Sequence, residues 1–240
     1  SDIGMRPNGR IDLKARISGD NGATWGKEFT IVEGKGANSP DFMNVGFGDP
    51  CIVADRESSR VLVLSCSGNV SFPNGSRNNH QGIAHFYSED YGRTWSEPVD
   101  RSESIYSQLD NTPYGPVRAM FVGSGKICQS RKYKYGSHYR IYAALCARPN
   151  GNRVLYSDDF GRTWHALGGR NALPVILGDE PKCEELPDGR VIISSRAWGG
   201  RYFNIYTYSD VASGAGHGDH FHCKGARRAL TRQCHRREPV

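Results

Sequence analysis

Apolar residues in this chain occur in short runs that glycine, proline and charged residues interrupt. The runs 51–55 (CIVAD) and 60–66 (RVLVLSC) flank the polar stretch RESS, a pattern typical of a β-hairpin. Comparable runs follow at 81–88, 140–147, 152–157, 190–196 and 201–209. None of them shows a sustained period of 3.6 residues, so the pattern predicts antiparallel β-structure throughout.

One octapeptide occurs three times, as SGDNGATW at 18–25, SEDYGRTW at 88–95 and SDDFGRTW at 157–164. The copies start 70 and 69 residues apart (88 − 18 and 157 − 88). In such a turn the aspartate can accept backbone N–H groups, the glycine tolerates positive φ, and the tryptophan packs under the turn. A turn that recurs between strand pairs predicts a β-propeller and assigns the octapeptide to architecture rather than to catalysis.

Composition narrows the class of protein further. A chain of 240 residues with 37% hydrophobic content is globular, and it holds no apolar run long enough to span a membrane. Residues 217–240 carry six Lys/Arg against two acids, which is +4 of the net charge of +6. The remaining body shows no basic stripe, so no nucleic-acid partner is predicted. Cys51, Cys66 and Cys146 lie in apolar runs and are expected to be buried, unpaired side chains.

The octapeptides resemble the Asp-box, S-x-D-x-G-x-T-W, also called the bacterial neuraminidase repeat. This resemblance implies an all-β, six-bladed β-propeller of the sialidase superfamily. Three boxes and nine to ten strand candidates fill about four blades, over residues 1–213. Because Asp-boxes also occur in propellers that only bind glycan or protein, a catalytic function must rest on other residues.

Other segments resemble the bacterial-type exo-sialidases and imply the residues of a site. SDIGMRPNGRIDLKARIS matches the loop of the acid/base aspartate, with Asp2 as the first candidate and Asp12 as the second. GFGDPCIVAD matches a segment whose aspartate, here Asp49, faces the N-acyl or O4 side of the substrate. Asp2 as a plain terminal residue and Asp49 as a turn former are the alternatives.

GDEPKCEELPDGRVIISSR resembles the segment that supplies a glutamate and a substrate arginine. Glu180 matches the glutamate that partners the nucleophile, and Arg196 matches the second arginine of the substrate clamp. Arg118, in GPVRAM, matches a loop at the rim of the site. Glu180 as a solvated loop residue and Arg196 as a paired surface charge are the alternatives.

The implied activity is that of an exo-α-sialidase, which hydrolyses terminal sialic acids of glycoconjugates with retention and needs no metal or cofactor. Sialic acid carries a carboxylate that arginines bind bidentately. That charge repels a carboxylate nucleophile, so sialidases use a tyrosine instead, which a glutamate activates. Sialylated glycans are therefore the expected partners, and a secreted, periplasmic or cell-surface location is expected. A non-catalytic Asp-box propeller that binds glycan or protein stays open as the alternative function.

Some parts of the sialidase pattern are absent from the sequence. The F/Y-R-I-P segment of the first clamp arginine does not occur, and residues 214–240 contain no tyrosine. Tyr202, Tyr206 and Tyr208 precede the expected position of the nucleophile and are expected to pack within strands. We therefore expect a fragment of a larger propeller, with impaired catalysis on its own.

Residues 214–240 form an atypical basic tail in which no period of two is evident. A solvated or non-native end is one interpretation. A metal site is another, although its spacing fits no standard zinc pattern. The metal site would draw on His217, His220, His222, Cys223, Cys234 and His235.

Overall fold

The computed structural model describes residues 9–175, 178–197, 200–210, 215–224 and 234–236. Asp2, the first candidate for the acid/base aspartate, lies outside these residues. The predicted all-β class is confirmed for the described part of the chain, in which β-strands form four sheets. No helix in that part is long and apolar enough to cross a membrane.

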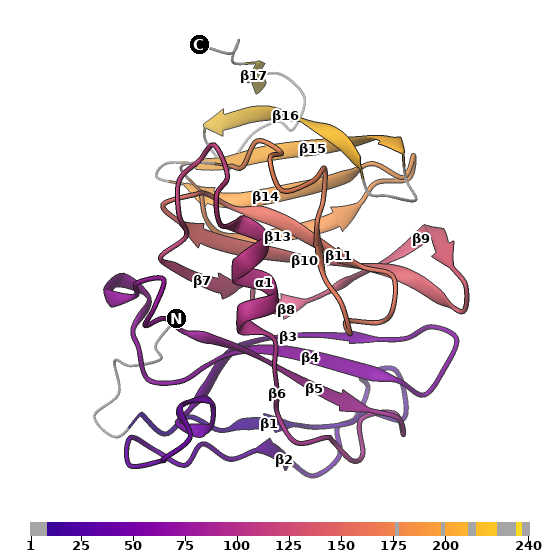
Figure 1. The fold of residues 1–240 in the computed structure, drawn as a ribbon. Coiled ribbons are helices and arrows are strands. Elements are labelled where there is room, and N and C mark those ends of the chain that lie inside the picture. The colour runs from indigo at the N-terminus through magenta and orange to yellow at the C-terminus, as the bar shows by residue number, and fades with distance from the viewer. Residues whose placement is uncertain (1–8, 176–177, 198–199, 211–214, 225–233, 237–240) are drawn as a thin grey trace.

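The sheets follow one another along the chain and in space, from indigo at the bottom of Figure 1 to yellow at its top. The first contains β1 (Leu13–Ala15) and β2 (Phe29–Val32). The second has the order β6-β5-β4-β3-β8, with β3 (Phe47–Ala54), β4 (Val61–Ser67), β5 (Gly82–Ser88), β6 (Val99–Asp100) and β8 (Gly125–Lys126).

The third sheet has the order β12-β11-β10-β7, and β9 also pairs with β10. Its strands are β7 (Ala119–Val122), β9 (Cys128–Tyr135), β10 (His138–Arg148), β11 (Arg153–Ser157) and β12 (His165–Ala166). The fourth runs in chain order through β13 (Asp179–Glu185), β14 (Val191–Ala197), β15 (Gly200–Asp210), β16 (Ala215–Lys224) and β17 (Cys234–Arg236).

The hydrophobic core lies between successive sheets. Every residue of β4 is buried, because this central strand has a neighbouring sheet on each face. The predicted burial of Cys51, Cys66 and Cys146 is confirmed, and all three are free thiols. One hydrophobic cluster joins the second and third sheets, and another joins the third and fourth. These clusters fix the positions of the strands in the three sheets.

The three Asp-box turns have the same hydrogen bonds, as their shared sequence predicts. In each, the aspartate carboxylate accepts the backbone N–H of the threonine, at 2.8 Å for Asp20, 2.9 Å for Asp90 and 2.8 Å for Asp159. Each serine hydroxyl accepts the N–H of the box glycine, which has positive φ. The serine and aspartate side chains of each box are therefore engaged in hydrogen bonds within their own turn.

The tryptophans of the boxes differ in burial, so the predicted packing under the turn holds for only part of the set. Trp164 is 4% exposed, whereas Trp25 is 60% exposed. The third box lies on the second sheet, where the Gly161 carbonyl accepts hydrogen bonds from Tyr87 Oη (2.8 Å) and His85 Nδ1 (3.1 Å). The first box belongs to the first described sheet, so no earlier sheet covers Trp25 in the described part of the chain.

Two features depart from the predicted all-antiparallel arrangement. Residues Ser102–Leu109 form the helix α1, which buries Ser102, Ile105, Tyr106 and Leu109 on one face. This i, i+3, i+4, i+7 pattern covers only two turns, too short to register as a sustained period. In addition, β8 pairs with β3 in parallel, because the chain leaves the third sheet between β7 and β9.

The fourth sheet continues past residue 213. Residues 215–224 form β16, which pairs antiparallel with β15 from Gly200 opposite Lys224 to Asp210 opposite Ala215. This pairing joins part of the basic tail to the sheet. The domain boundary at residue 213, the origin of the tail and a metal site within it stay predictions.

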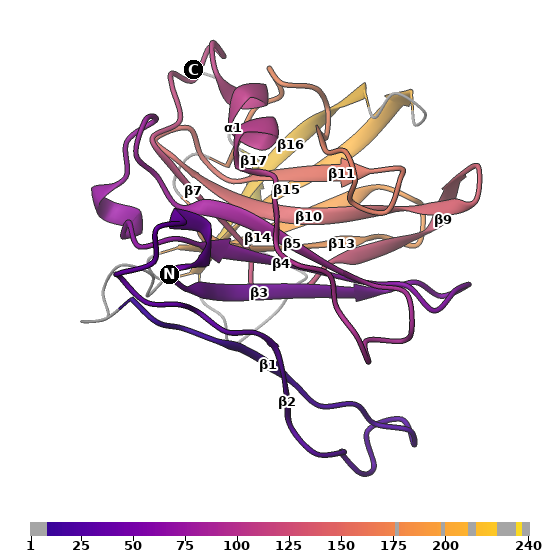
Figure 2. The same ribbon diagram turned by 60° about the horizontal axis from the view of Figure 1, so that its bottom comes forward.

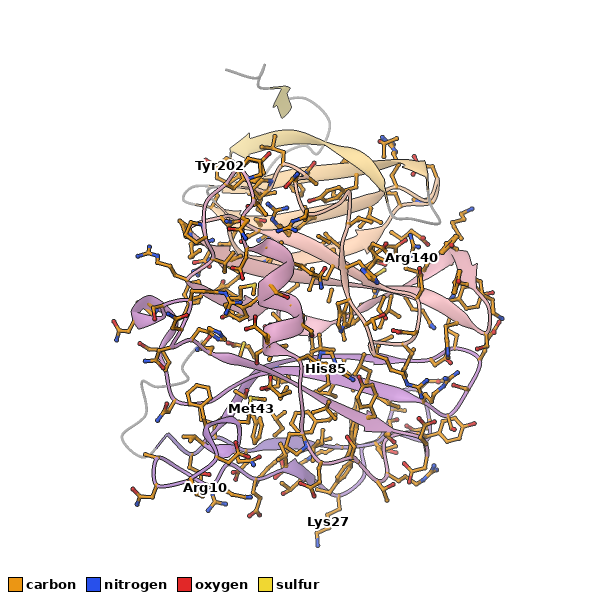
Figure 3. All side chains as sticks on the ribbon, viewed as in Figure 1. Arg10, Lys27, Met43, His85, Arg140 and Tyr202 are labelled. Carbon is orange, nitrogen blue, oxygen red and sulfur yellow. The ribbon has the colours of Figure 1, made fainter. Side chains whose placement is uncertain are left out.

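We expect the stability of the fold to fall as the pH drops below about 6.5, because His85 is buried between the second and third sheets (Figure 3). Burial, aided by the nearby charge of Arg101, lowers the pKa of His85 to about 3. Between these two pH values the unfolded chain binds one more proton than the folded chain, so stability decreases by about 1.4 kcal/mol per pH unit.

Urea unfolding at pH 7.5, 6.0 and 5.0 tests this expectation. The His85→Gln variant should be less stable than the wild type at pH 7.5 and should lose less stability on acidification. Equal pH slopes for the two proteins would show that His85 is not responsible.

Candidate functional site

The strands β3 and β13 carry the same backbone irregularity, in each case near the first residues of the strand. The pairing of β3 with β4 shifts between Gly48 and Cys51, and that of β13 with β14 shifts between Asp179 and Lys182. A bulge of this kind re-aims a side chain. Asp49 (φ 50°) and Glu180 (φ 30°) lie within these shifts with positive φ, a conformation that costs free energy in a residue with a side chain. The two irregularities therefore make this end of β3 and β13 the candidate functional site.

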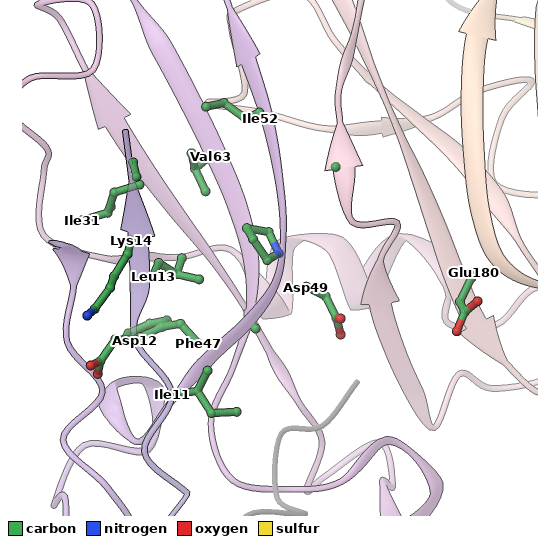
Figure 4. Close-up of a pocket in the computed structure, with 14 residues that line it drawn as sticks. Ile11, Asp12, Leu13, Lys14, Ile31, Phe47, Asp49, Ile52, Val63 and Glu180 are labelled. Carbon is green, nitrogen blue, oxygen red and sulfur yellow. The ribbon is translucent and has the colours of Figure 1, made fainter. Parts of the chain in front are cut away.

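Asp49 and Glu180 line one open cleft of about 750 Å³. Figure 4 shows their side chains on either side of the same space, one from β3 and the other from β13. The rest of the wall is largely apolar and comes from β1 with the segment before it, and from β2, β3 and β4. It includes Ile11, Leu13, Ile31, Phe47, Ile52 and Val63. The cleft thus combines a largely apolar wall with a few polar groups, namely the carboxylates of Asp12, Asp49 and Glu180 and the ammonium of Lys14, as small-molecule sites do.

A smaller adjoining cleft of about 280 Å³ shares the Asp49 and Glu180 carboxylates and adds three cations, Lys182, Arg196 and Arg201. Arg201 is oriented by Ser194, whose hydroxyl and carbonyl accept hydrogen bonds from its guanidinium. The two clefts together place cations and carboxylates within reach of a single ligand.

Arg196 is held by two neighbouring acids. Its Nε lies 3.0 Å from Glu180 Oε2, and its Nη2 lies 3.2 Å from Asp179 Oδ2. The side chains of Arg196 and Glu180 are 57% and 56% exposed, so the pair adds little to stability. The guanidinium is thereby oriented while it stays accessible to a ligand.

Asp179 links Arg196 to a second arginine. Its Oδ1 lies 3.5 Å from Arg148 Nη2, and that same Nη2 donates to the Gly178 carbonyl at 2.6 Å. Burial alone would raise the pKa of Asp179. Hydrogen bonds from Arg196 and from the Glu180 N–H, with the charges of both arginines, hold that pKa below its ordinary value instead. Asp179 is therefore a carboxylate at neutral pH and can orient Arg196.

The remaining sequence candidates lie apart from this group. Asp12 lines the larger cleft, but its carboxylate accepts the Gly34 N–H at 3.0 Å and the Arg10 Nε at 3.3 Å. Arg118 is exposed next to β7 and is absent from the lining of both clefts.

Two of the three tyrosine candidates have described side chains. Tyr206 is buried between the third and fourth sheets, as predicted for strand packing, and burial raises its pKa to about 12. Tyr202 packs at the edge of the same cluster.

Four charged residues of the site were not found by sequence reasoning: Arg148, Asp179, Lys182 and Arg201. Asp179 and Lys182 flank Glu180 and could have been noted for their proximity to it. Nothing in the sequence around Arg148 indicates that its side chain lies near Asp179, because that proximity depends on how the third and fourth sheets are placed. Arg201 lies opposite Arg196 in the β14–β15 pairing of the fourth sheet, so its proximity depends on the register of that pairing.

An all-β chain of successive sheets, with Asp-box turns and a charged cleft at one end of its inner strands, defines the class of Asp-box propeller-like proteins. The profile of the BNR repeat-like domain matches residues 4–213, so the chain belongs to that family. The predicted likeness to bacterial-type sialidases with these repeats is confirmed by the relatives that the chain matches.

The curated relatives include the sialidase of Micromonospora viridifaciens, 32% identical over 207 residues, which is 80% of this chain and 29% of that protein. The sialidase of Paraclostridium sordellii is 29% identical over 219 residues, 88% of this chain and 50% of that protein. The chain thus spans between about a third and a half of the length of these two relatives.

Solved structures show the same fold. The intramolecular trans-sialidase of Ruminococcus gnavus, in complex with oseltamivir carboxylate, has a TM-score of 0.65 and 15% identity, and the match covers 91% of this chain and 65% of that one. The sialidase of Trypanosoma rangeli, in complex with 2,3-difluorosialic acid, has a TM-score of 0.60 and 16% identity, with 83% and 31% covered.

Proposed function

We propose that this chain belongs to an exo-α-sialidase that hydrolyses terminal sialic acids of glycoconjugates with retention of configuration. The observation that carries the proposal is the oriented, exposed Arg196, which shares a cleft with Glu180 and Asp49. The curated relatives named sialidase support the reaction class. The complex of the T. rangeli sialidase with 2,3-difluorosialic acid supports the substrate class.

We assign each described residue a role in this reaction. The Arg196 guanidinium offers two N–H donors to the substrate carboxylate, and a bidentate pair fixes both its position and its orientation. Glu180 lies beside it as the base that draws the proton from a tyrosine nucleophile, because a phenol with a pKa of about 10 is a poor nucleophile at neutral pH. Asp49 faces the other side of the sugar across the cleft.

Further parts of the proposal concern residues and features beyond this cleft. Asp2 is assigned the acid/base role and Arg118 a place on the rim. The fold is assigned to the six-bladed propeller of the sialidase superfamily, of which this chain forms about four blades. The cellular location proposed is secreted, periplasmic or cell-surface, where sialylated glycans are found.

Binding and release are measured separately to test the proposal. Isothermal titration with methyl α-sialoside should give binding, and the neutral methyl β-galactoside should give none. In a protein that joins this chain to a complete propeller, release of 4-methylumbelliferone from its α-sialoside should occur and should be abolished in the Glu180→Gln variant, whereas release by the chain alone should be weak or absent. Nuclear magnetic resonance of the first product should show the α-anomer if configuration is retained.

Binding of the sialoside without release by the complete propeller would favour the alternative, a propeller that recognises glycan without cleaving it. Failure to bind the sialoside at all would overturn the proposal. Release that is unchanged in Glu180→Gln would remove that residue from the mechanism.

A further inference from the structure

A second charged cleft lies near the last residues of β3 and β13. It has a volume of about 260 Å³, and its wall includes Ile52–Ala54 at the end of β3 and Glu184 on β13. Asp49 and Glu180, by contrast, lie near the starts of these strands. Because a strand rises by about 3.3 Å per residue, Glu184 lies roughly 13 Å along β13 from Glu180. On β3 the two clefts are neighbours, since Ile52 lines both of them.

Three cations from separate parts of the chain line this second cleft: Arg56, Lys126 and Arg131. Glu184 is the one acid in its wall, and it is occupied by Lys126 Nζ at 2.7 Å and by the Cys128 thiol at 3.2 Å. The cleft therefore has a net positive charge. The sequence gives no sign of it, because these cations lie 70 and 5 residues apart (126 − 56 and 131 − 126).

The Arg56 guanidinium is oriented in advance. It donates to the backbone carbonyls of Gln129 and Ser130 and lies over the ring of Tyr139, at 4.5 Å from the ring centre. Carbonyl partners leave its full positive charge available to a ligand. The exposed Arg131 donates its backbone N–H to Glu185, while its side chain lines the cleft.

The hairpin of β9 and β10 continues this surface. It extends beyond its neighbouring sheets at the right of Figure 2. Residues 131–140 (RKYKYGSHYR) contain no acid, but Lys134 Nζ pairs with Glu57 at 2.5 Å and so adds no unpaired charge. Arg140, at the base of the hairpin (Figure 3), is buried and paired with Asp158 at 2.7 Å, so it does not contribute. Tyr135, near the tip, is 60% exposed.

We propose that this cleft and the β9–β10 hairpin bind an anionic polysaccharide, with a sulfate or carboxylate group of the ligand between Arg56, Lys126 and Arg131. Guanidinium groups bind both kinds of anion through paired N–H donors. An exposed tyrosine beside cations offers an apolar face to a sugar ring and a hydroxyl to its polar groups. The proposal is independent of the reaction proposed for the other cleft.

The test is the affinity of the full chain for two polysaccharides. Heparin carries both sulfate and carboxylate groups, whereas polygalacturonate carries carboxylate groups alone. At low salt the double variant Lys126→Gln/Arg131→Gln should weaken binding by about five- to tenfold. Tyr135→Ala, which changes no charge, should weaken it by about threefold. The double variant Arg16→Gln/Lys27→Gln is the control, because it loses the same charge in the segment between β1 and β2. Its affinity for the polysaccharides should stay within about twofold of that of the wild type.

Heparin bound more tightly than polygalacturonate would assign the pocket to sulfate, and the reverse order would assign it to carboxylate. Equal losses in the two double variants, or an unchanged Tyr135→Ala, would overturn the proposal. Tighter binding of duplex DNA than of either polysaccharide would overturn it as well. The substituted residues are exposed, so thermal melting curves of all variants should coincide with that of the wild type.

Discussion

Replacing Arg196 with glutamine is expected to weaken the binding of methyl α-sialoside by about a hundredfold, because two hydrogen bonds between charged groups are lost. Asp179 and Glu180 already orient the Arg196 guanidinium, so little side-chain entropy is lost when the ligand binds. In the variant the Glu180 carboxylate stays in the cleft without the Arg196 cation and repels the ligand carboxylate. Isothermal titration of the wild type and the variant measures the change.

The Arg190→Gln variant is the matched control. Arg190 lies at the other end of the β13–β14 hairpin and pairs with Asp188 at 2.7 Å, with 45% of its side chain exposed. Its loss removes the same charge from the same sheet and should leave binding within about twofold. Similar losses for the two variants would indicate a general effect of charge and would contradict a specific role for Arg196.

Replacing Trp164 with alanine is expected to lower the free energy of unfolding by about 3–5 kcal/mol, the usual cost of truncating a buried aromatic side chain. Trp164 packs in the cluster between the second and third sheets, and its carbonyl accepts a hydrogen bond from Gln108 of α1. The loss would leave a cavity at the point where the third Asp-box meets the second sheet. Urea unfolding gives the difference directly.

The Trp25→Ala variant is the control, since Trp25 holds the same position in the first box. With 60% of its surface exposed, it should change the free energy of unfolding by no more than about 0.5 kcal/mol. A large loss for Trp25→Ala, or a small one for Trp164→Ala, would show that the boxes do not stabilise the protein through packing between sheets.

These two tryptophans show how far the sequence determines the fold. The turn itself is local, so the hydrogen bonds of Asp20, Asp90 and Asp159 follow from eight residues and were predicted correctly. The burial of the tryptophan depends on the sheet that lies opposite, which the eight residues do not encode. The helix α1 and the parallel pairing of β8 could not be predicted either, because both segments are too short to show a period and depend on packing against distant parts of the chain.

The candidate site divides in the same way. A family resemblance singled out Asp49, Glu180 and Arg196, and the structure brings all three to one cleft. Their roles remain predictions. Arg201 was missed because its place opposite Arg196 results from the register of β14 and β15, and Asp179 comes to lie opposite Arg196 through the register of β13 and β14. Arg118 was chosen by resemblance alone, and it lies outside the lining of the cleft.

The most direct test of the central claim, that the charged cleft and not the Asp-box is the ligand site, is a crystal structure of the chain soaked with methyl α-sialoside. We expect the ligand carboxylate at about 3 Å from the Arg196 guanidinium, the usual distance of a charge-assisted hydrogen bond. The sugar ring should lie between Asp49 and Glu180. A sialoside bound at an Asp-box turn, with the Arg196 cleft free of ligand, would show that the cleft is not the ligand site.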